Sequence, residues 1–305
     1  MIRAGAMKYR CFSFASTVKI PGFPYHLPHI EGSVQACIKN GIGIMMDSGV
    51  VGFRTYKTSL KKAGKDLSKI PTDLEFTKLY VSYIKATQQH WDFFMGCDHL
   101  QEAESIYQNH LFVESLGIRP VPVFHGDKAA SDYVRRYADL GYDFLAISSW
   151  KTIRTGQKKF RQYLDEVFNI CSRLKMRVHG LAMTASYMMC EYPFFSVDSS
   201  SWSRAAGYGT IFRFDEDARR MSSFHISDRA TKGKGADAKH NIAFMQRVKE
   251  DVESCGYSFD VMRQAEGEEA FVLRHIWNAQ QMEKLAQYAT KIHASGGLGS
   301  WEPLI

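Results

Sequence analysis

The sequence predicts an α/β protein built as a (β/α)8 barrel with additional helices at its C-terminal end. Short apolar segments bounded by turn residues alternate with longer segments of helical periodicity, the pattern of parallel strands joined by helices. The chain has 305 residues, and a barrel of this kind takes about 250 residues. We therefore expect one domain over residues 1–305, with the barrel at about 8–230 and a helical part at about 238–305.

Each element of the barrel is expected from its own segment. The strands are expected at residues 9–14, 42–46, 93–97, 121–124, 144–147, 178–183 and 195–197, and an eighth at 210–214 would close the barrel. Helices are expected at residues 74–89, 102–116, 129–140, 158–175, 240–254 and 268–294. Three of them end at or just before Gly117, Gly141 and Lys175, residue types suited to a helix C-terminus.

The composition is that of a globular enzyme. Hydrophobic residues make up 45% of the chain and charged residues 23%, which argues against disordered and fibrous classes. No segment has 18 consecutive apolar residues, and the N-terminus lacks the apolar stretch of a secretory signal, so we expect a cytoplasmic protein with no membrane partner. The six cysteines are scattered without a CxxC pair and are expected to be reduced thiols.

Polar residues follow five of the expected strands. In a parallel barrel the C-terminal ends of the strands meet at one mouth, where active sites form. The polar residues found there are Asp47, Ser48 and Gly49 after the second strand, Asp98 after the third, His125 and Gly126 after the fourth, Ser148 and Ser149 after the fifth, and Asp198 after the seventh. We expect these residues to form a shared site.

The three aspartates allow two interpretations. An aspartate between a strand and a helix commonly caps the helix N-terminus. Two carboxylates beside one glycosidic carbon instead provide the chemistry that breaks such bonds, one as nucleophile and the other as acid and base. Three such aspartates in one chain, Asp47, Asp98 and Asp198, favour the active site over separate caps.

The net charge of +7 is concentrated in three segments, residues 57–65, 151–161 and 229–239. Solvated helix faces and loops explain such runs as well as a polyanion partner does, and their position near strand ends favours the partner. The candidate phosphate-binding residues are Lys57, Lys61, Lys62, Lys65, Lys151, Arg154, Lys232 and Lys234.

Five motifs follow one another along the chain, MMDSGVVGF, PVFHG, YDFLAISS, FFSVDSSSW and HNIAFMQRV. This ordered set resembles the tRNA-guanine transglycosylase superfamily. MMDSGVVGF looks like the family's strand with the acid/base aspartate, and FFSVDSSSW looks like the strand with the nucleophilic aspartate. The segment HNIAFMQRV reads very like a helix of the bacterial enzymes. With PVFHG and YDFLAISS, the motifs cover about residues 40–250 in the family's order.

Departures from the family pattern point to its compact members. A histidine matching His240 joins three upstream cysteines at a structural zinc site in the tRNA enzymes, but no cysteine lies between Asp198 and His240 here. We therefore expect neither the zinc site nor any other cofactor. The family's base-stacking aromatic is replaced by Val51, with Phe53 as the expected substitute, and its base-reading glutamine by His125. A zinc-less chain of this kind is similar to the DNA-guanine transglycosylases of phages and bacterial DNA-modification clusters.

The resemblance implies a base exchange. Asp198 would attack the anomeric carbon, Asp47 would serve as general acid and base, and a free 7-deazaguanine would replace guanine. Asp98 would bind the base, with Ser48, Gly49, Phe53, His125, Gly126, Ser148 and Ser149 around it.

The expected polymer is DNA, from which the target nucleotide must be flipped or presented single-stranded. Two alternatives stay open, a transglycosylase acting on tRNA and a barrel that binds nucleic acid without catalysis. The sequence does not indicate the oligomeric state.

Overall fold

The computed structural model describes two compact units, each considered by itself here. The first holds Met7–Met183 and Phe194–Asp198, and the second holds Ile2–Ala6, Thr184–Pro193 and Ser199–Ile305. Within them the backbone is described for residues 2–3, 9–13, 30–99, 102–125, 130–148, 157–227 and 238–295, and side chains for residues 35–99, 102–125, 130–148, 157–227 and 245–294.

The first unit contains parallel strands in the order of the chain. They are β2 (Tyr9–Ser13), β3 (Gly43–Asp47), β4 (Phe93–Phe94), β5 (Val123–His125), β6 (Phe144–Ser148), β7 (Arg177–Leu181) and β8 (Ser196–Val197). Ladders join β2 to β3 to β4 and β5 to β6 to β7 to β8, and a parallel bridge from Met95 to Val121 joins the two sheets. The seven strands expected from the sequence are confirmed, each within a few residues of its expected bounds.

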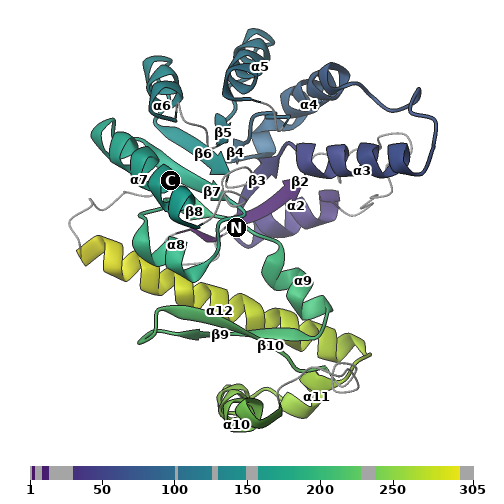
Figure 1. Ribbon diagram of the computed structural model, residues 1–305. Coiled ribbons are helices and arrows are strands. Elements are labelled where there is room, and N and C mark those ends of the chain that lie inside the picture. Colours follow the sequence, from purple (N-terminus) through teal and green to yellow (C-terminus); the bar gives the residue numbers. More distant parts are fainter. Residues whose placement is uncertain are drawn as a thin grey trace. The chain divides into compact units, whose positions relative to one another are not determined.

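Helices lie around the outside of these strands (Figure 1). They are α2 (Ile30–Lys39), α3 (Val50–Lys62), α4 (Asp73–Thr87), α5 (Ala103–Ser115), α6 (Ala130–Asp139) and α7 (Gln157–Arg173). The alternation of strand and helix confirms the α/β class. Gly117 and Gly141 have φ angles of 84° and 80°, and Lys175 has 55°, so all three end their helices with the left-handed turn expected of them.

Apolar side chains on the two faces of the strands form separate clusters. Met45, Met95, Val123 and Ala146 pack together from β3, the bridge, β5 and β6. On the other face, Ile44 and Met46 of β3 pack against α3 and α4 through residues such as Phe53 and Phe76. Because neighbouring residues of β3 point to opposite faces, β3 contributes to both clusters and is buried on both sides.

The eighth strand expected at residues 210–214 is present, but its observed partner is not a parallel strand of the first unit. Thr210–Asp215 forms β9, which pairs antiparallel with β10 (Arg220–His225). Asp215 Oδ1 accepts a hydrogen bond of 2.9 Å from the Ala218 amide, so the polar stretch after β9 is a tight turn that reverses the chain. This hairpin belongs to the second unit, whereas β2 to β8 belong to the first.

The second unit contains this hairpin and helices. They are α8 (Ser186–Glu191), α9 (Ser201–Gly207), α10 (Ala238–Ser254), α11 (Phe259–Arg263) and α12 (Glu268–Ser295), so the expected C-terminal helices are present. Side chains of α12 cover the edge of β9. Asn278 Oδ1 accepts from the Phe212 amide at 2.7 Å, and Gln281 Oε1 accepts from the Phe214 amide at 3.0 Å. The two side chains thus give hydrogen-bond partners to backbone N–H groups at the edge of β9 that would otherwise lack them.

Candidate active site

The three aspartates at strand ends are not helix caps. Asp47 is the last residue of β3, Asp98 follows β4, and Asp198 follows β8. The N-cap residues of the helices that come next are Gly49 for α3, Glu102 for α5 and Ser200 for α9, and none of these helices has a side-chain cap. The structure therefore gives no support to the capping interpretation.

Asp47 lies in an environment that disfavours its charge. Burial, then the negative charges of Asp198 and Asp98, raise its pKa to about 7, although the Gly49 and Ser48 amides oppose this. The Gly49 amide donates to Asp47 Oδ2 at 3.0 Å. Because the charges of both other aspartates act on the pKa of Asp47, the three carboxyl groups belong to one site. A carboxyl with a pKa near 7 can release and take up a proton at neutral pH.

Asp98 contacts His125 across two neighbouring strand ends. Asp98 is 7% exposed and His125 is 3% exposed, and His125 Nε2 donates a hydrogen bond to Asp98 Oδ2. The other ring nitrogen, Nδ1, is buried and has no hydrogen-bond partner among the described residues. The structure thus joins two residues that the sequence analysis had assigned to the base separately.

Asp198 is held by the backbone after β7. The Ala182 amide donates to Asp198 Oδ1 at 2.7 Å, and Ala182 has a φ angle of 57°, a conformation that non-glycine residues seldom adopt. His179 Nε2 lies 3.8 Å from the same oxygen. Within the described part of the chain Oδ2 of Asp198 accepts no hydrogen bond, so this oxygen is available to react.

Other expected site residues are only partly described. Ser148 is paired in register with His125 on one side and Leu181 on the other, so it lies at the same strand edge. Ser48 is buried at 4% exposure and Gly49, with φ 73°, begins the turn into α3. Gly126 and Ser149 lie outside the described residues.

The expected stacking residue is in the core. Phe53 has no exposed surface and its ring stacks on Phe76, with 4.2 Å between ring centroids. Helix α3 places Val50 and Phe53 on one face, three residues apart, and both are buried there. Val51, which the sequence analysis compared with a stacking aromatic, is 56% exposed. Phe53 as it stands is therefore a packing residue with no face free for a base.

The lysines expected to bind phosphates differ in their exposure and in whether their charge is paired. Lys61, Lys62 and Lys65 are exposed at the end of α3 and just beyond it. Lys57 instead pairs with Asp73 at 3.2 Å, which neutralises it locally. The other candidates, Lys151, Arg154, Lys232 and Lys234, lie outside the described residues.

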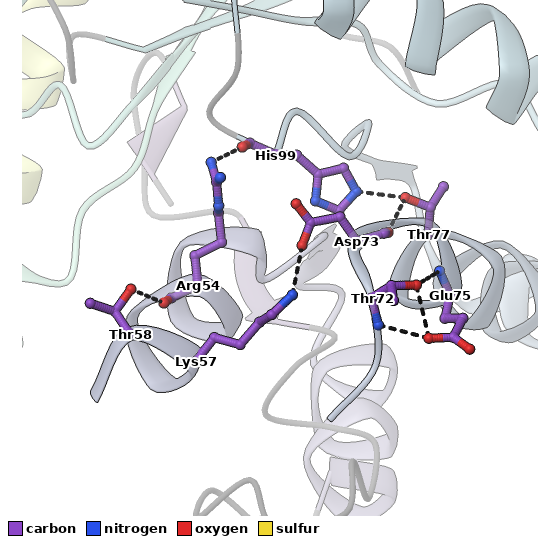
Figure 2. A network of polar contacts seen from close by, with 8 residues as sticks. All are labelled: Arg54, Lys57, Thr58, Thr72, Asp73, Glu75, Thr77 and His99. Carbon is purple, nitrogen blue, oxygen red and sulfur yellow. Dashed lines mark hydrogen bonds and ion pairs between the residues drawn. The ribbon is translucent and has the colours of Figure 1, made fainter. Parts of the chain in front are cut away.

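Sequence reasoning missed a network around His99, the residue after Asp98 in the chain (Figure 2). Arg54 of α3 donates to the carbonyl of His99, whose Nε2 lies 2.6 Å from Thr77 Oγ1 of α4. Thr77 Oγ1 also donates to the Asp73 carbonyl at 3.0 Å, so it accepts from His99 Nε2–H. His99 has a φ angle of 47°, and burial lowers its pKa. The network thus fixes the residue next to Asp98.

The sequence analysis also missed His179. Its side chain is fully buried in β7, and burial lowers its pKa to about 4, so it is neutral at pH 7. The signal was present in the sequence, since a histidine in the middle of an apolar strand needs a hydrogen-bond partner.

No metal-binding group is evident in the part of the chain described. Among those residues no three His, Cys, Asp or Glu side chains are grouped to hold an ion. The side chain of His240 lies outside the described set, so the expected loss of the zinc site stays a prediction. Within the same part of the chain no helix is long and apolar enough to span a bilayer.

Comparison with known proteins gives no relative for this chain. Neither protein-family models, nor curated protein sequences, nor solved structures produce a match.

Proposed function

We propose that the protein is a guanine transglycosylase that exchanges guanine in DNA for a free 7-deazaguanine base. The observation that carries this proposal is the placement of three aspartates at strand ends, with Asp47 ending β3, Asp98 following β4 and Asp198 following β8. The burial of Asp47 and the charges of the other two raise its pKa to about 7. Paired carboxyl groups with different environments are how enzymes separate the nucleophile from the acid and base at a glycosidic carbon.

The proposed architecture is a (β/α) barrel with this site at its mouth. The strands β2 to β8 are parallel and follow one another in chain order, which is the barrel's strand order. Asp198 follows β8 and Asp47 ends β3, yet the charge of one acts on the other. Because β3 and β8 are far apart in the strand order, this effect favours a strand arrangement curved toward closure.

In the first step of the proposed reaction, Asp198 Oδ2 attacks C1′ of the target nucleotide. The bond from C1′ to guanine N9 breaks, and protonated Asp47 gives its proton to the leaving base. The product is a glycosyl ester on Asp198, free guanine and ionised Asp47. The Ala182 amide, bound to Oδ1, keeps the other carboxylate oxygen directed at the sugar.

In the second step, the incoming deazaguanine loses its N9 proton to Asp47 and attacks C1′. The ester bond breaks, Asp198 is regenerated as a carboxylate, and the two displacements retain the configuration at C1′. Asp98 and His125 are the proposed binding pair for both bases, because a carboxylate accepts from the N1–H and amino groups of guanine. No redox or nucleotide cofactor takes part in this scheme.

DNA is the proposed polymer, with tRNA as the alternative. The exposed Lys61, Lys62 and Lys65 supply positive charge for the phosphates. A flipped nucleotide then reaches the strand ends at a cost of a few kcal/mol.

The direct test is incubation of the protein with radiolabelled guanine and either duplex DNA or tRNA. The proposal predicts label in DNA and none in the same DNA treated with the Asp198→Asn variant. Label in tRNA alone would reject DNA as the polymer but would agree with the proposed base exchange. Nucleic-acid binding with no label in either polymer would identify a non-catalytic binding protein.

A further inference from the structure

The imidazole of His179 is a buried group beside Asp198 that the proposed exchange does not use. His179 on β7 is paired in register with Ser196 on β8, and its Nδ1 lies 2.8 Å from Ser196 Oγ. Its Nε2 has no hydrogen-bond partner among the described residues and lies 3.8 Å from Asp198 Oδ1. Both His179 and Ser196 are almost without exposed surface, at 0% and 2%.

The neighbours of this ring select its tautomer. A neutral imidazole carries one N–H and one lone pair, and the partner of each nitrogen decides which is which. A lone pair on Nε2 would face the Asp198 carboxylate and be repelled, whereas an N–H there is attracted. Nε2 is therefore the protonated nitrogen, Nδ1 is the acceptor, and Ser196 Oγ–H donates to Nδ1.

We infer that Ser196 and His179 form a positioning pair for Asp198, in which Ser196 fixes the ring and His179 Nε2–H is directed at Oδ1. This rests on the proposed role of Asp198 as nucleophile. The Ala182 amide is bound to the same oxygen, so both donors act on Oδ1 and leave Oδ2 to attack. The 3.8 Å separation is too long for a hydrogen bond in the free protein, so the inference requires that Nε2 and Oδ1 approach each other when substrate binds.

The position of the pair predicts what it affects. His179 has no exposed surface and touches no substrate, so removing it should leave the affinity for both bases unchanged. Orientation of the reacting oxygen affects the chemical step instead. The expected signature is a fall in kcat with KM preserved.

A test that needs no activity is nitrogen NMR of the full chain labelled with ¹⁵N-histidine. The expected result is a His179 ring protonated at Nε2 and not at Nδ1, with that preference weakened in Asp198→Ala. Protonation at Nδ1 in the unmodified protein would overturn the inference, because Nε2 would then present its lone pair to Asp198.

Kinetics of guanine exchange supply the second test. His179→Gln and Ser196→Ala should lower kcat by about 10- to 100-fold, the usual effect of losing a partner that orients a functional group. Ser196→Ala keeps the ring, so it remains informative if His179→Gln folds poorly. His110→Gln is the matched control, because His110 is also buried with a pKa lowered to about 4, but its Nε2 bonds Tyr142.

The outcomes separate the inference from the proposed function. Equal falls in kcat for His179→Gln and His110→Gln, or unchanged kcat in both His179→Gln and Ser196→Ala, would reject the positioning pair. If the unmodified protein exchanges no base on any polymer, the proposed function fails, and the tautomer measured by NMR still decides whether His179 faces Asp198 as inferred.

Discussion

His125 Nε2 donates a hydrogen bond to Asp98 Oδ2, and the two side chains lie buried at neighbouring strand ends. The contact occupies one oxygen of the carboxylate that is proposed to bind the base. His125 therefore sets the orientation of the Asp98 carboxylate. A glutamine at this position could also donate to the carboxylate, but with a different reach.

Substitution of His125 should weaken base binding according to whether a donor remains. His125→Leu leaves Asp98 without this donor and should weaken guanine binding by about 10- to 100-fold, the effect of losing a hydrogen bond to a charged group. His125→Gln restores a donor and should weaken guanine binding less than His125→Leu does. Calorimetric titration with guanine measures both, and equal losses in the two variants would show that the hydrogen bond does not matter.

The raised pKa of Asp47 should make the folded protein less stable as pH rises. The pKa is about 7 in the folded chain and about 3.9 in an unfolded one. Between these pH values the folded state holds a proton that the unfolded chain has released. The contribution of Asp47 to the unfolding free energy is therefore complete below pH 4 and is lost as pH rises through 7.

Asp47→Asn should remove this dependence. Relative to that variant, the unmodified protein should lose about 2 kcal/mol of unfolding free energy between pH 5 and 8, after allowance for the partial exposure of Asp47. Urea unfolding at several pH values measures the difference. Parallel curves for the two proteins would mean that the pKa of Asp47 is not raised.

The network around His99 should stabilise the fold and hold the residue next to Asp98 in place. Thr77→Val removes the partner of His99 Nε2 and should lower the unfolding free energy by about 1 to 3 kcal/mol, since a buried nitrogen is left unsatisfied. Thr58→Val is the control, because the Thr58 hydroxyl makes only an exposed bond to the Arg54 carbonyl. Denaturant unfolding compares them. Similar losses in both would show that the His99 bond adds nothing.

The lysines at the end of α3 and just beyond it should govern affinity for DNA but not base choice. Replacing Lys61, Lys62 and Lys65 together by alanine should weaken binding and reduce the dependence of log K on log salt by about 2 to 3. Fluorescence titrations with DNA at several salt concentrations measure the slope. An unchanged dependence of log K on log salt would mean that these three lysines do not contact the DNA phosphates.

Much of the first unit could be predicted because its signals are local. The strand at 144–148 is an apolar run preceded by Gly141, and both features were legible in the sequence. The hairpin was not, because β10 has only two apolar residues, Met221 and Phe224, without regular alternation, and its pairing depends on a turn at Asp215. Asn278 and Gln281 were missed since their partners on β9 lie more than sixty residues away.

The candidate site shows the same division. Position at strand ends was enough to select Asp47, Asp98 and Asp198, because the ends of parallel strands meet. Phe53 was misassigned to the pocket although helical spacing from Val50 already placed it on the buried face. The pKa of Asp47 and the contact of Asp98 with His125 depend on distances between strands, which no single segment of sequence contains.

The most direct test of the account is a search for the covalent intermediate on Asp198. The protein is mixed with DNA in the absence of any free base, quenched in acid, digested, and its peptides are weighed by mass spectrometry. The account predicts a nucleotide-linked peptide containing Asp198, release of free guanine, and loss of the adduct when deazaguanine is added before the quench. Release of guanine with no adduct, or an adduct on another residue, would contradict the assignment of Asp198 as the nucleophile.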